Sequence, residues 1–210
     1  METMTRISFL PLALLLAPAP LAAQARWSVE AFGGTALSLR TPLTIRQRGQ
    51  ADVRLTARWS TRPLRDAPYY AYRVERWSGD TAWSLELLHH KLYLENPPPE
   101  VGHFEVSHGY NLLTLSRVWA RGAWDVRAGA GAVVAHAESK VRGREHASGY
   151  RLSGAAAQLG LGRRLPLGRH LSVVAEGKAT GAWARVPVAD GSAEVPNAAV
   201  HALVGAGWRF

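Results

Sequence analysis

Charged and polar side chains recur at every second position along several apolar segments of this sequence. Arg73 and Glu75, for example, share one row of residues 69–77, opposite a row of apolar and aromatic residues. Successive strand residues point to opposite faces, so such rows predict strands with one polar face. The residues that we expect to line a common polar interior are Arg73, Glu75, Glu86, His90, Asp125, Arg127, Gln158, Glu176, Lys178, His201 and Arg209.

The chemistry of such a cluster is limited first by the cost of burying charge. An unpaired charge in a dry interior is expensive, whereas acids and bases of matched number can neutralise one another. The predicted interior is matched in this way, with Glu75, Glu86, Asp125 and Glu176 facing Arg73, Arg127, Lys178 and Arg209. We therefore predict a packing network of ion pairs. Catalysis or ligand binding by some of its members is the alternative.

Two histidine patterns are weaker signals for chemistry. His89 and His90 are adjacent, so on a strand they point to opposite faces and cannot share a metal ion. His146 and Ser148 have a spacing that suits a base and a nucleophile on one strand face, but residues 139–149 are polar and predict a loop. We predict no bound metal and no cofactor, and we assign no catalytic residue.

Elements that could position these side chains follow from the alternation of turns and loops. Short turns are predicted at 78–80, 120–122 and 165–169, and longer polar loops at 93–102, 139–149 and 186–196. This order is typical of an all-β, closed antiparallel up-and-down transmembrane β-barrel with its short turns in the periplasm. Nine segments look like strands, and a barrel with both ends in the periplasm needs an even number. We favour eight, with one early segment as an excursion of the first outer loop; ten is the alternative.

The C-terminal residues carry a further barrel pattern. Apolar residues alternate with small or polar ones from 197 to 210, and Trp208 and Phe210 end the apolar row. This ending resembles the C-terminal signal by which outer-membrane barrels are recognised, so we predict that these two residues are an assembly signal for the barrel-assembly machinery. Tryptophans near the predicted periplasmic turns predict an aromatic girdle there: Trp77, Trp83, Trp119, Trp124 and Trp208.

Residues 1–25 have the order of a secretory signal peptide. Arg6 precedes an apolar run, and Ala23 and Ala25 form an Ala-x-Ala site, so we expect cleavage before Arg26. The remainder, 26–210, is predicted to be one barrel domain. It contains no disulfide because the chain has no cysteine. Export argues against nucleic acid as the partner of a chain with net charge +9. Outer-membrane lipids, including lipopolysaccharide, are the predicted partners of a monomer in the outer membrane of a Gram-negative-type bacterium.

Several short motifs after residue 67 follow one another with a characteristic spacing. They are Pro68-Tyr69-Tyr70, His90-Lys91-Leu92-Tyr93, His108-Gly109-Tyr110-Asn111-Leu112-Leu113, Gly129-Ala130-Gly131, His136-Ala137-Glu138, Tyr150-Arg151-Leu152-Ser153-Gly154 and Ala175-Glu176-Gly177-Lys178. In these motifs the chain resembles a family of small outer-membrane β-barrel proteins that includes lipid A oxidases. The sequence departs from the family at Trp124-Asp125-Val126-Arg127, where the family often has Pro-Tyr-Val-Gly, and it matches only loosely before residue 61.

The resemblance implies a fold and a location, and it assigns no catalytic residue. We therefore expect a porin-like outer-membrane β-barrel with a packed polar lumen. Its role would be structural, or the binding of lipid or a small ligand in the cell envelope. The alternative is an envelope enzyme that modifies lipid A, oxidase-like or deacylase-like.

Overall fold

The computed structural model describes residues 26–65 and 67–210, and the predicted signal peptide lies outside these described residues. They form one sheet of 13 strands whose neighbours are all antiparallel. Among the described residues, no helix has the length and apolar character needed to cross a membrane.

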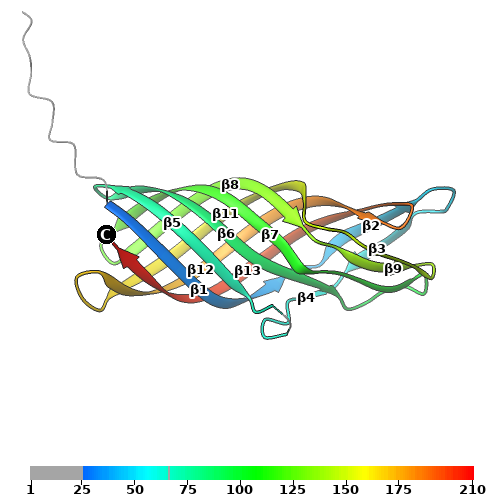
Figure 1. The fold of residues 1–210 in the computed structure, drawn as a ribbon, viewed down its shortest axis with the longest axis horizontal. Coiled ribbons are helices and arrows are strands. Elements are labelled where there is room, and N and C mark those ends of the chain that lie inside the picture. Colours follow the sequence, from blue (N-terminus) through cyan, green and yellow to red (C-terminus); the bar gives the residue numbers. More distant parts are fainter. Residues whose placement is uncertain (1–25, 66) are drawn as a thin grey trace, which may run out of the picture.

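Eight of the strands close into a ring in chain order (Figure 1). They are β1 (Arg26–Ser38), β5 (Tyr70–Ser78), β6 (Thr81–Leu94), β7 (Val101–Arg121), β8 (Trp124–Ala135), β11 (Arg151–Pro166), β12 (Leu171–Val188) and β13 (Gly191–Arg209). The last strand pairs with the first, with Arg209 opposite Ser28, and this pairing closes the barrel. The predicted eight-stranded, up-and-down antiparallel barrel is confirmed, and the ten-stranded alternative is wrong.

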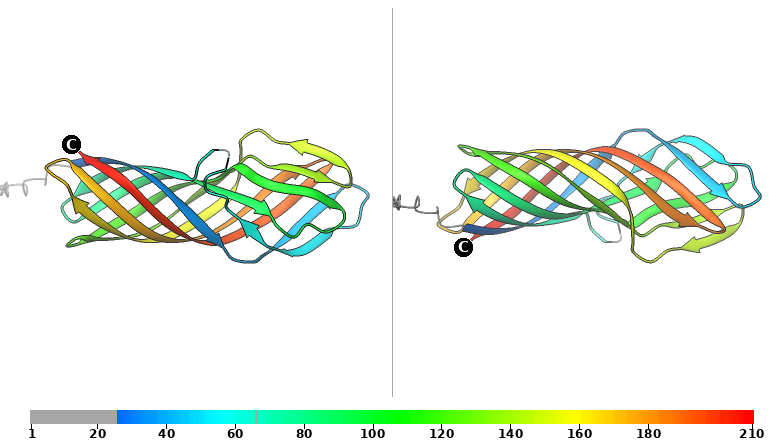
Figure 2. Two further views of the ribbon diagram at one scale, coloured as in Figure 1. Left: turned by 90° about the horizontal axis from the view of Figure 1, so that it is seen from below. Right: turned by 90° about the horizontal axis from the view of Figure 1, so that it is seen from above.

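Five shorter strands prolong the barrel at the end away from both Arg26 and the C-terminus. They are β2 (Thr41–Gln47), β3 (Val53–Ala57), β4 (Trp59–Ser60), β9 (Glu138–Val141) and β10 (Arg144–Ala147). The β2–β3 hairpin pairs with β13, β4 pairs with β6, and the β9–β10 hairpin pairs with β7. Together with the distal ends of β6, β7, β12 and β13 they form what we call the extension, which is seen in both views of Figure 2.

Two predicted outer loops are strands instead. Residues 139–149 contain most of the β9–β10 hairpin, which turns at Arg142 and Gly143 with positive φ angles of 50° and 75°. A two-residue turn of this kind matches the twist of a hairpin. The polar composition of the segment suggested a loop because the hairpin lies at the edge of the extension, where many of its side chains face water.

Residues 186–196 were also expected to be a loop, yet β12 and β13 pair through almost all of this segment. Their ladder runs out to Val188 opposite Gly191, and only Ala189 and Asp190 form the turn. Two prolines lie within this ladder. Pro187 and Pro196 each occupy a place in the ladder at which the missing N–H is tolerated.

The polarity of the ring and that of the extension are opposite. In the ring, large apolar residues are exposed on the outside, among them Val74, Leu85, Leu115, Val126, Leu159 and Val204, whereas charged residues are buried inside. In the extension, apolar residues are buried, among them Leu43, Ile45, Leu92, Phe104, Val186 and Val195. The hydrophobic core of the molecule therefore lies in the extension and in the part of the ring that adjoins it.

An aromatic girdle surrounds the end of the ring at which Arg26 and Phe210 lie. Trp27, Trp83, Trp119, Trp124, Trp208 and Phe210 are all exposed there. The prediction is wrong for Trp77, which is only 5% exposed. Trp77 continues the inward row of Arg73 and Glu75 on β5, so its ring closes the interior and does not face outward.

Candidate functional site

Arg73 on β5 stands at the centre of a buried cluster of charges inside the ring. Its guanidinium donates hydrogen bonds to three carboxylates, each at 2.8 Å: Nη1 to Glu30 Oε2, Nε to Glu86 Oε2, and Nη2 to Glu176 Oε1. None of these four side chains is more than 1% exposed. A planar guanidinium with five donors is suited to join several carboxylates in this way.

Two further cations extend this cluster and add a fourth carboxylate, Glu75. Arg127 on β8 donates from Nη1 to Glu75 Oε1 at 3.1 Å, and its Nε lies 2.9 Å from Glu176 Oε2. Lys178 on β12 contacts Glu86, and its Nζ lies 3.2 Å from Glu176 Oε1. Every cation therefore serves at least two carboxylates, and the cluster is one connected network.

Arg164 on β11 closes this network at the mouth beside the short turns. It contacts Glu30, and its Nη2 lies 3.3 Å from Glu75 Oε2 and 3.1 Å from Asp125 Oδ2. Trp77 donates from Nε1 to Glu75 at 2.9 Å. The network then holds five carboxylates and four cations, so its charges almost cancel, as a dry interior requires.

A layer of neutral polar groups lies farther along the interior, towards the extension. Gln158 donates to Thr114 Oγ1 at 2.8 Å and to Ser116 Oγ at 2.9 Å. His201 is joined to Tyr69 through Nδ1 and to Thr180 through Nε2 at 2.7 Å.

His90 completes this neutral layer, with Nε2 3.1 Å from Asn197 Oδ1. The three predicted residues of the layer, Gln158, His90 and His201, are therefore buried and bonded to neutral partners. They do not take part in the ion pairs.

The remaining predicted residues fall into two groups. The structure brings Arg73, Glu75, Glu86, Asp125, Arg127, Glu176 and Lys178 together in the network. Arg209 lies instead at the mouth, with its guanidinium 5.8 Å from the centre of a Trp77 ring, and it does not join these ion pairs. Among the described residues, Arg164 therefore supplies the cation at this end of the network that was predicted to be Arg209.

Sequence reasoning missed two members of the network, Glu30 and Arg164. Both lie on strand rows whose alternation could have identified them as inward-facing residues. Glu30 alternates with Val29 and Ala31 on β1, and Arg164 belongs to the same row of β11 as Gln158. The glycines at 160 and 162 obscured the second row. Glycine is neither clearly polar nor clearly apolar, so such a row does not indicate whether it faces the interior or the lipid.

His146 and Ser148, whose spacing was a weak signal for catalysis, do not form a base and a nucleophile. Ser148 is buried, and its Oγ accepts a hydrogen bond from the backbone N of Ala137 at 3.0 Å. His146 lies on β10, the edge strand of the extension. Among the described residues, no hydrogen bond joins the two side chains.

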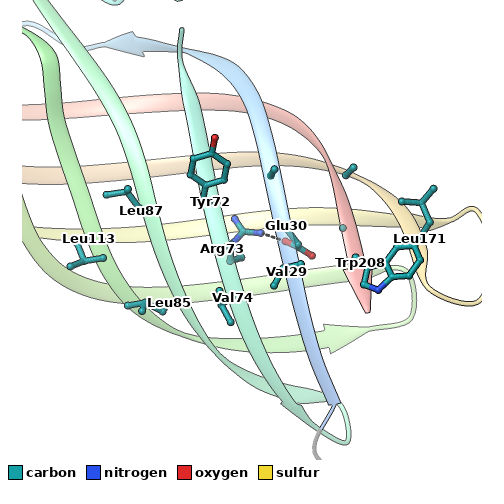
Figure 3. Close-up of a pocket in the computed structure, with 13 residues that line it drawn as sticks. Val29, Glu30, Tyr72, Arg73, Val74, Leu85, Leu87, Leu113, Leu171 and Trp208 are labelled. Carbon is teal, nitrogen blue, oxygen red and sulfur yellow. Dashed lines mark hydrogen bonds and ion pairs between the residues drawn. The ribbon is translucent and has the colours of Figure 1, made fainter. Parts of the chain in front are cut away.

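The outer wall of the ring is apolar and is hollowed by a shallow groove over β1, β5 and β13. Figure 3 shows the groove, with the ion pair of Arg73 and Glu30 beside the strands that form its floor. The apolar residues that line it include Val29, Tyr72, Val74, Leu85, Leu87, Leu113, Leu171 and Trp208. Small residues, Ala31 and Ala206, leave room for it.

An apolar band between aromatic girdles, wrapped around a charged interior, is the arrangement of a barrel that crosses a lipid bilayer. Because the ring is closed, every strand in the band is paired on both sides, as hydrocarbon requires. Tyr72, Tyr150 and Trp183 are exposed near the other end of the band and mark the second interface. The chain is an outer-membrane barrel, with its short turns and the extension at opposite ends of the membrane-crossing band.

Comparison with known proteins gives structural neighbours only. No protein-family model matches the chain, and no curated protein matches it by sequence. The attachment invasion locus protein Ail of Yersinia pestis is similar in structure with a TM-score of 0.45 and 13% identity, over 89% of this chain and 99% of Ail. Outer membrane protein AlkL, solved in lipid bilayers, has a TM-score of 0.47 and 12% identity over 98% of this chain and 97% of AlkL.

Neisserial surface protein A is also similar, with a TM-score of 0.41 and 9% identity over 90% of this chain and 99% of that protein. All these TM-scores are below 0.5. The assignment to a transmembrane barrel therefore stands on the closed ring and on the polarity of its wall.

Proposed function

We propose that the chain is a sealed outer-membrane barrel that anchors the extension at the cell surface. Its partners in this role are outer-membrane lipids, including lipopolysaccharide, and it acts as a monomer with a structural part in the envelope. The observation that carries the proposal is the buried ion-pair network around Arg73, which occupies the interior that a channel would leave open to water.

The ion pairs of the network cross the lumen and so close it. Arg73 on β5 reaches Glu176 on β12, although β1 and β13 stand between these strands on the ring. Arg127 on β8 reaches Glu75 on β5 in the same manner. A barrel of eight strands has an interior just wide enough for side chains to fill, and these long side chains fill it.

Lipid contact is supported by the outer interface of the wall. On β12, Trp183 is exposed at the second aromatic girdle, and Arg185 follows it on the same face, one residue pair farther from the membrane centre. On β11, the exposed Tyr150 is followed directly by the exposed Arg151. Arginines at or just beyond an aromatic girdle are placed to bind lipid phosphates with charge-assisted hydrogen bonds.

The proposal is tested by ion conductance across planar bilayers. The purified chain should insert and show no sustained conductance, because side chains close its lumen. A variant with both Arg73→Ala and Glu176→Ala serves as the positive control, since it shortens two side chains that meet in the lumen. Stable conductance by the unaltered chain would overturn the sealed-barrel proposal.

The enzymatic alternative has its own test, lipid A mass spectrometry of cells with and without the chain. The sealed-barrel proposal predicts identical lipid A in both. A change in lipid A mass that depends on the chain would favour the envelope enzyme in place of a purely structural role.

A further inference from the structure

Three side chains that can bind a metal ion meet where the ring joins the extension, outside the lumenal network. His108 Nδ1 lies 2.9 Å from Glu138 Oε1, and His136 Nε2 lies 3.5 Å from the same oxygen. The three donor atoms are all within 4.8 Å of one another. In a tetrahedral zinc site with bonds of about 2.0–2.1 Å, donor atoms lie about 3.3 Å apart. A small movement of the side chains would therefore place all three around one ion.

We propose that His108, His136 and Glu138 bind a divalent transition-metal ion of the zinc type at the cell surface. Two imidazoles and a carboxylate are ligands for zinc, copper, nickel or iron(II), whereas magnesium and calcium prefer an all-oxygen set. Three protein ligands leave at least one position of a tetrahedral ion for water.

The site is open to the outside. The side chains of His108, Glu138 and His136 are 49%, 31% and 22% exposed, so a hydrated ion can reach them. This accessibility separates them from the histidines of the interior. His90 and His201 are buried and already bonded to neutral partners.

A bulge in β7 directs His108 toward the other two ligands. The ladder between β6 and β7 pairs His90 with Tyr110 and then Leu92 with Val106, so β7 has extra residues between these pairs. Bulges commonly re-aim a side chain next to a functional site. Gly109 within the bulge has a φ of 138°, a backbone conformation that favours glycine, and a Cβ there would lie 2.3 Å from Asn111 Nδ2 unless that side chain moved.

Further contacts hold the two histidines in place. Tyr150 donates from its hydroxyl to the backbone O of His108 at 2.7 Å, and its ring packs edge-on against His136 with centroids 5.1 Å apart. The backbone N of His136 donates to the O of Gly109 at 3.0 Å. Support of this kind fixes ligand orientation before an ion arrives.

The charge around the site also favours a cation. Glu105 on β7 lies directly opposite Glu138 on β9 in the ladder, and like charges in that relation repel. A bound dication between His108, His136 and Glu138 would offset this repulsion. The neighbouring Lys140 is directed to Glu145, with Nζ 3.0 Å from Oε1, and so does not neutralise Glu138.

Zinc binding to the full chain, purified in detergent after treatment with a chelator, tests the proposal by calorimetry. We expect one saturable Zn²⁺ site per chain. His108→Ala, His136→Ala and Glu138→Gln should each weaken zinc binding at least about tenfold. Loss of a residue that only supports a metal ligand already weakens binding by about that factor, and loss of the ligand itself should cost no less. The matched control is His103→Ala, because His103 is an exposed histidine on the same strand that lies outside the cluster, and it should bind zinc as the unaltered chain does.

Copper(II) paramagnetic resonance adds a readout of the ligands themselves. The unaltered chain should show two coordinated nitrogens, and His136→Ala should show one. Heat-modifiable migration in electrophoresis establishes that each variant is folded, and Glu138→Gln keeps the shape of the site if an alanine variant fails. Absence of saturable zinc binding to the unaltered chain would overturn the proposal. So would an equal loss in His103→Ala and His136→Ala, or binding of Mg²⁺ as tight as that of Zn²⁺.

Discussion

The ring and the extension are built from continuous strands, yet their polarities are reversed. On β13 the inward row changes from Ala193 and Val195 in the extension to Asn197 and His201 in the ring. The outward row changes in the opposite sense, from Glu194 to Val200 and Val204. The reversal shows where the surroundings change from water to hydrocarbon, because buried faces must match the groups that they contact.

Each region is stabilised by a different interaction as a result. The extension is a conventional β-structure in water, held by burial of apolar side chains. The ring gains less from placing apolar groups inside, because the lipid around it is equally apolar. Its interior is held by ion pairs and hydrogen bonds that are satisfied within the protein. Substitutions in the two regions should therefore have different effects on stability.

The largest effect is expected at the centre of the ring. Arg73→Met removes the cation that joins Glu30, Glu86 and Glu176, so it should lower the free energy of unfolding by at least about 3–5 kcal/mol. Urea unfolding in detergent or lipid measures the loss. Arg76→Met is the matched control, since Arg76 is on the same strand but on its exposed face. Equal losses in the two variants would contradict the network.

A comparable substitution in the extension should act on a different region. Leu43→Ala empties part of the apolar core, and such changes cost about 2–5 kcal/mol. Hydrogen exchange should show weaker protection of β2 and β3 while the ring keeps its protection. Leu64→Ala is the control, because Leu64 is 92% exposed. Loss of protection over the whole ring would show that the two regions do not differ as described.

The outer wall gives a somewhat smaller and depth-dependent effect. Val204→Arg places a charge in the lipid-facing band, at a cost of about 2–4 kcal/mol near the midplane. Ala147→Arg, on the exposed edge strand of the extension, should change the stability by no more than about 0.5 kcal/mol. Unfolding in bilayers compares the two variants, and a tolerated arginine at 204 would argue against lipid contact there.

The smallest effect is a local pH dependence in the extension. Hydrogen bonds from Ser60 and then Arg62 lower the pKa of Glu95 below its ordinary value. A depressed folded-state pKa means that this contact stabilises the fold above the unfolded-state pKa of about 4.3 and is lost as the pH falls through the lower, folded-state pKa. The protection factor of the Ser60 amide, which is its intrinsic exchange rate divided by the observed rate, should fall on acidification. In Glu95→Gln this protection factor should not change over that pH range, and an identical acid response in both would contradict the assignment.

The sequence was sufficient to predict the ring because its strands have one polar and one apolar face. Alternation placed Arg73, Glu86 and Lys178 on inward rows, and the C-terminal strand had the ending of a membrane barrel. The extension was not predicted, because its strands continue those of the ring with the faces exchanged. On β13 the apolar row changes face near residue 197, so the alternation predicts a strand only after that residue and a loop before it.

The candidate sites were predictable to different degrees. The alternation along a strand could assign a residue to the interior, but it does not predict which residues on different strands contact each other. Glu30 and Arg164 were missed for that reason. The cluster of His108, His136 and Glu138 depends on a bulge at Gly109 and on the junction between β8 and β9, and neither has a periodic signal in the sequence.

The measurement that tests the central claim most directly is the solvent accessibility of labels along the outward row of β13. The chain has no cysteine, so single variants can be labelled with a nitroxide at one site each. Glu194→Cys should be accessible to a water-soluble relaxation agent, whereas Val200→Cys and Val204→Cys should be accessible to oxygen dissolved in lipid. Water accessibility at all three positions would contradict the reversal of polarity between extension and ring.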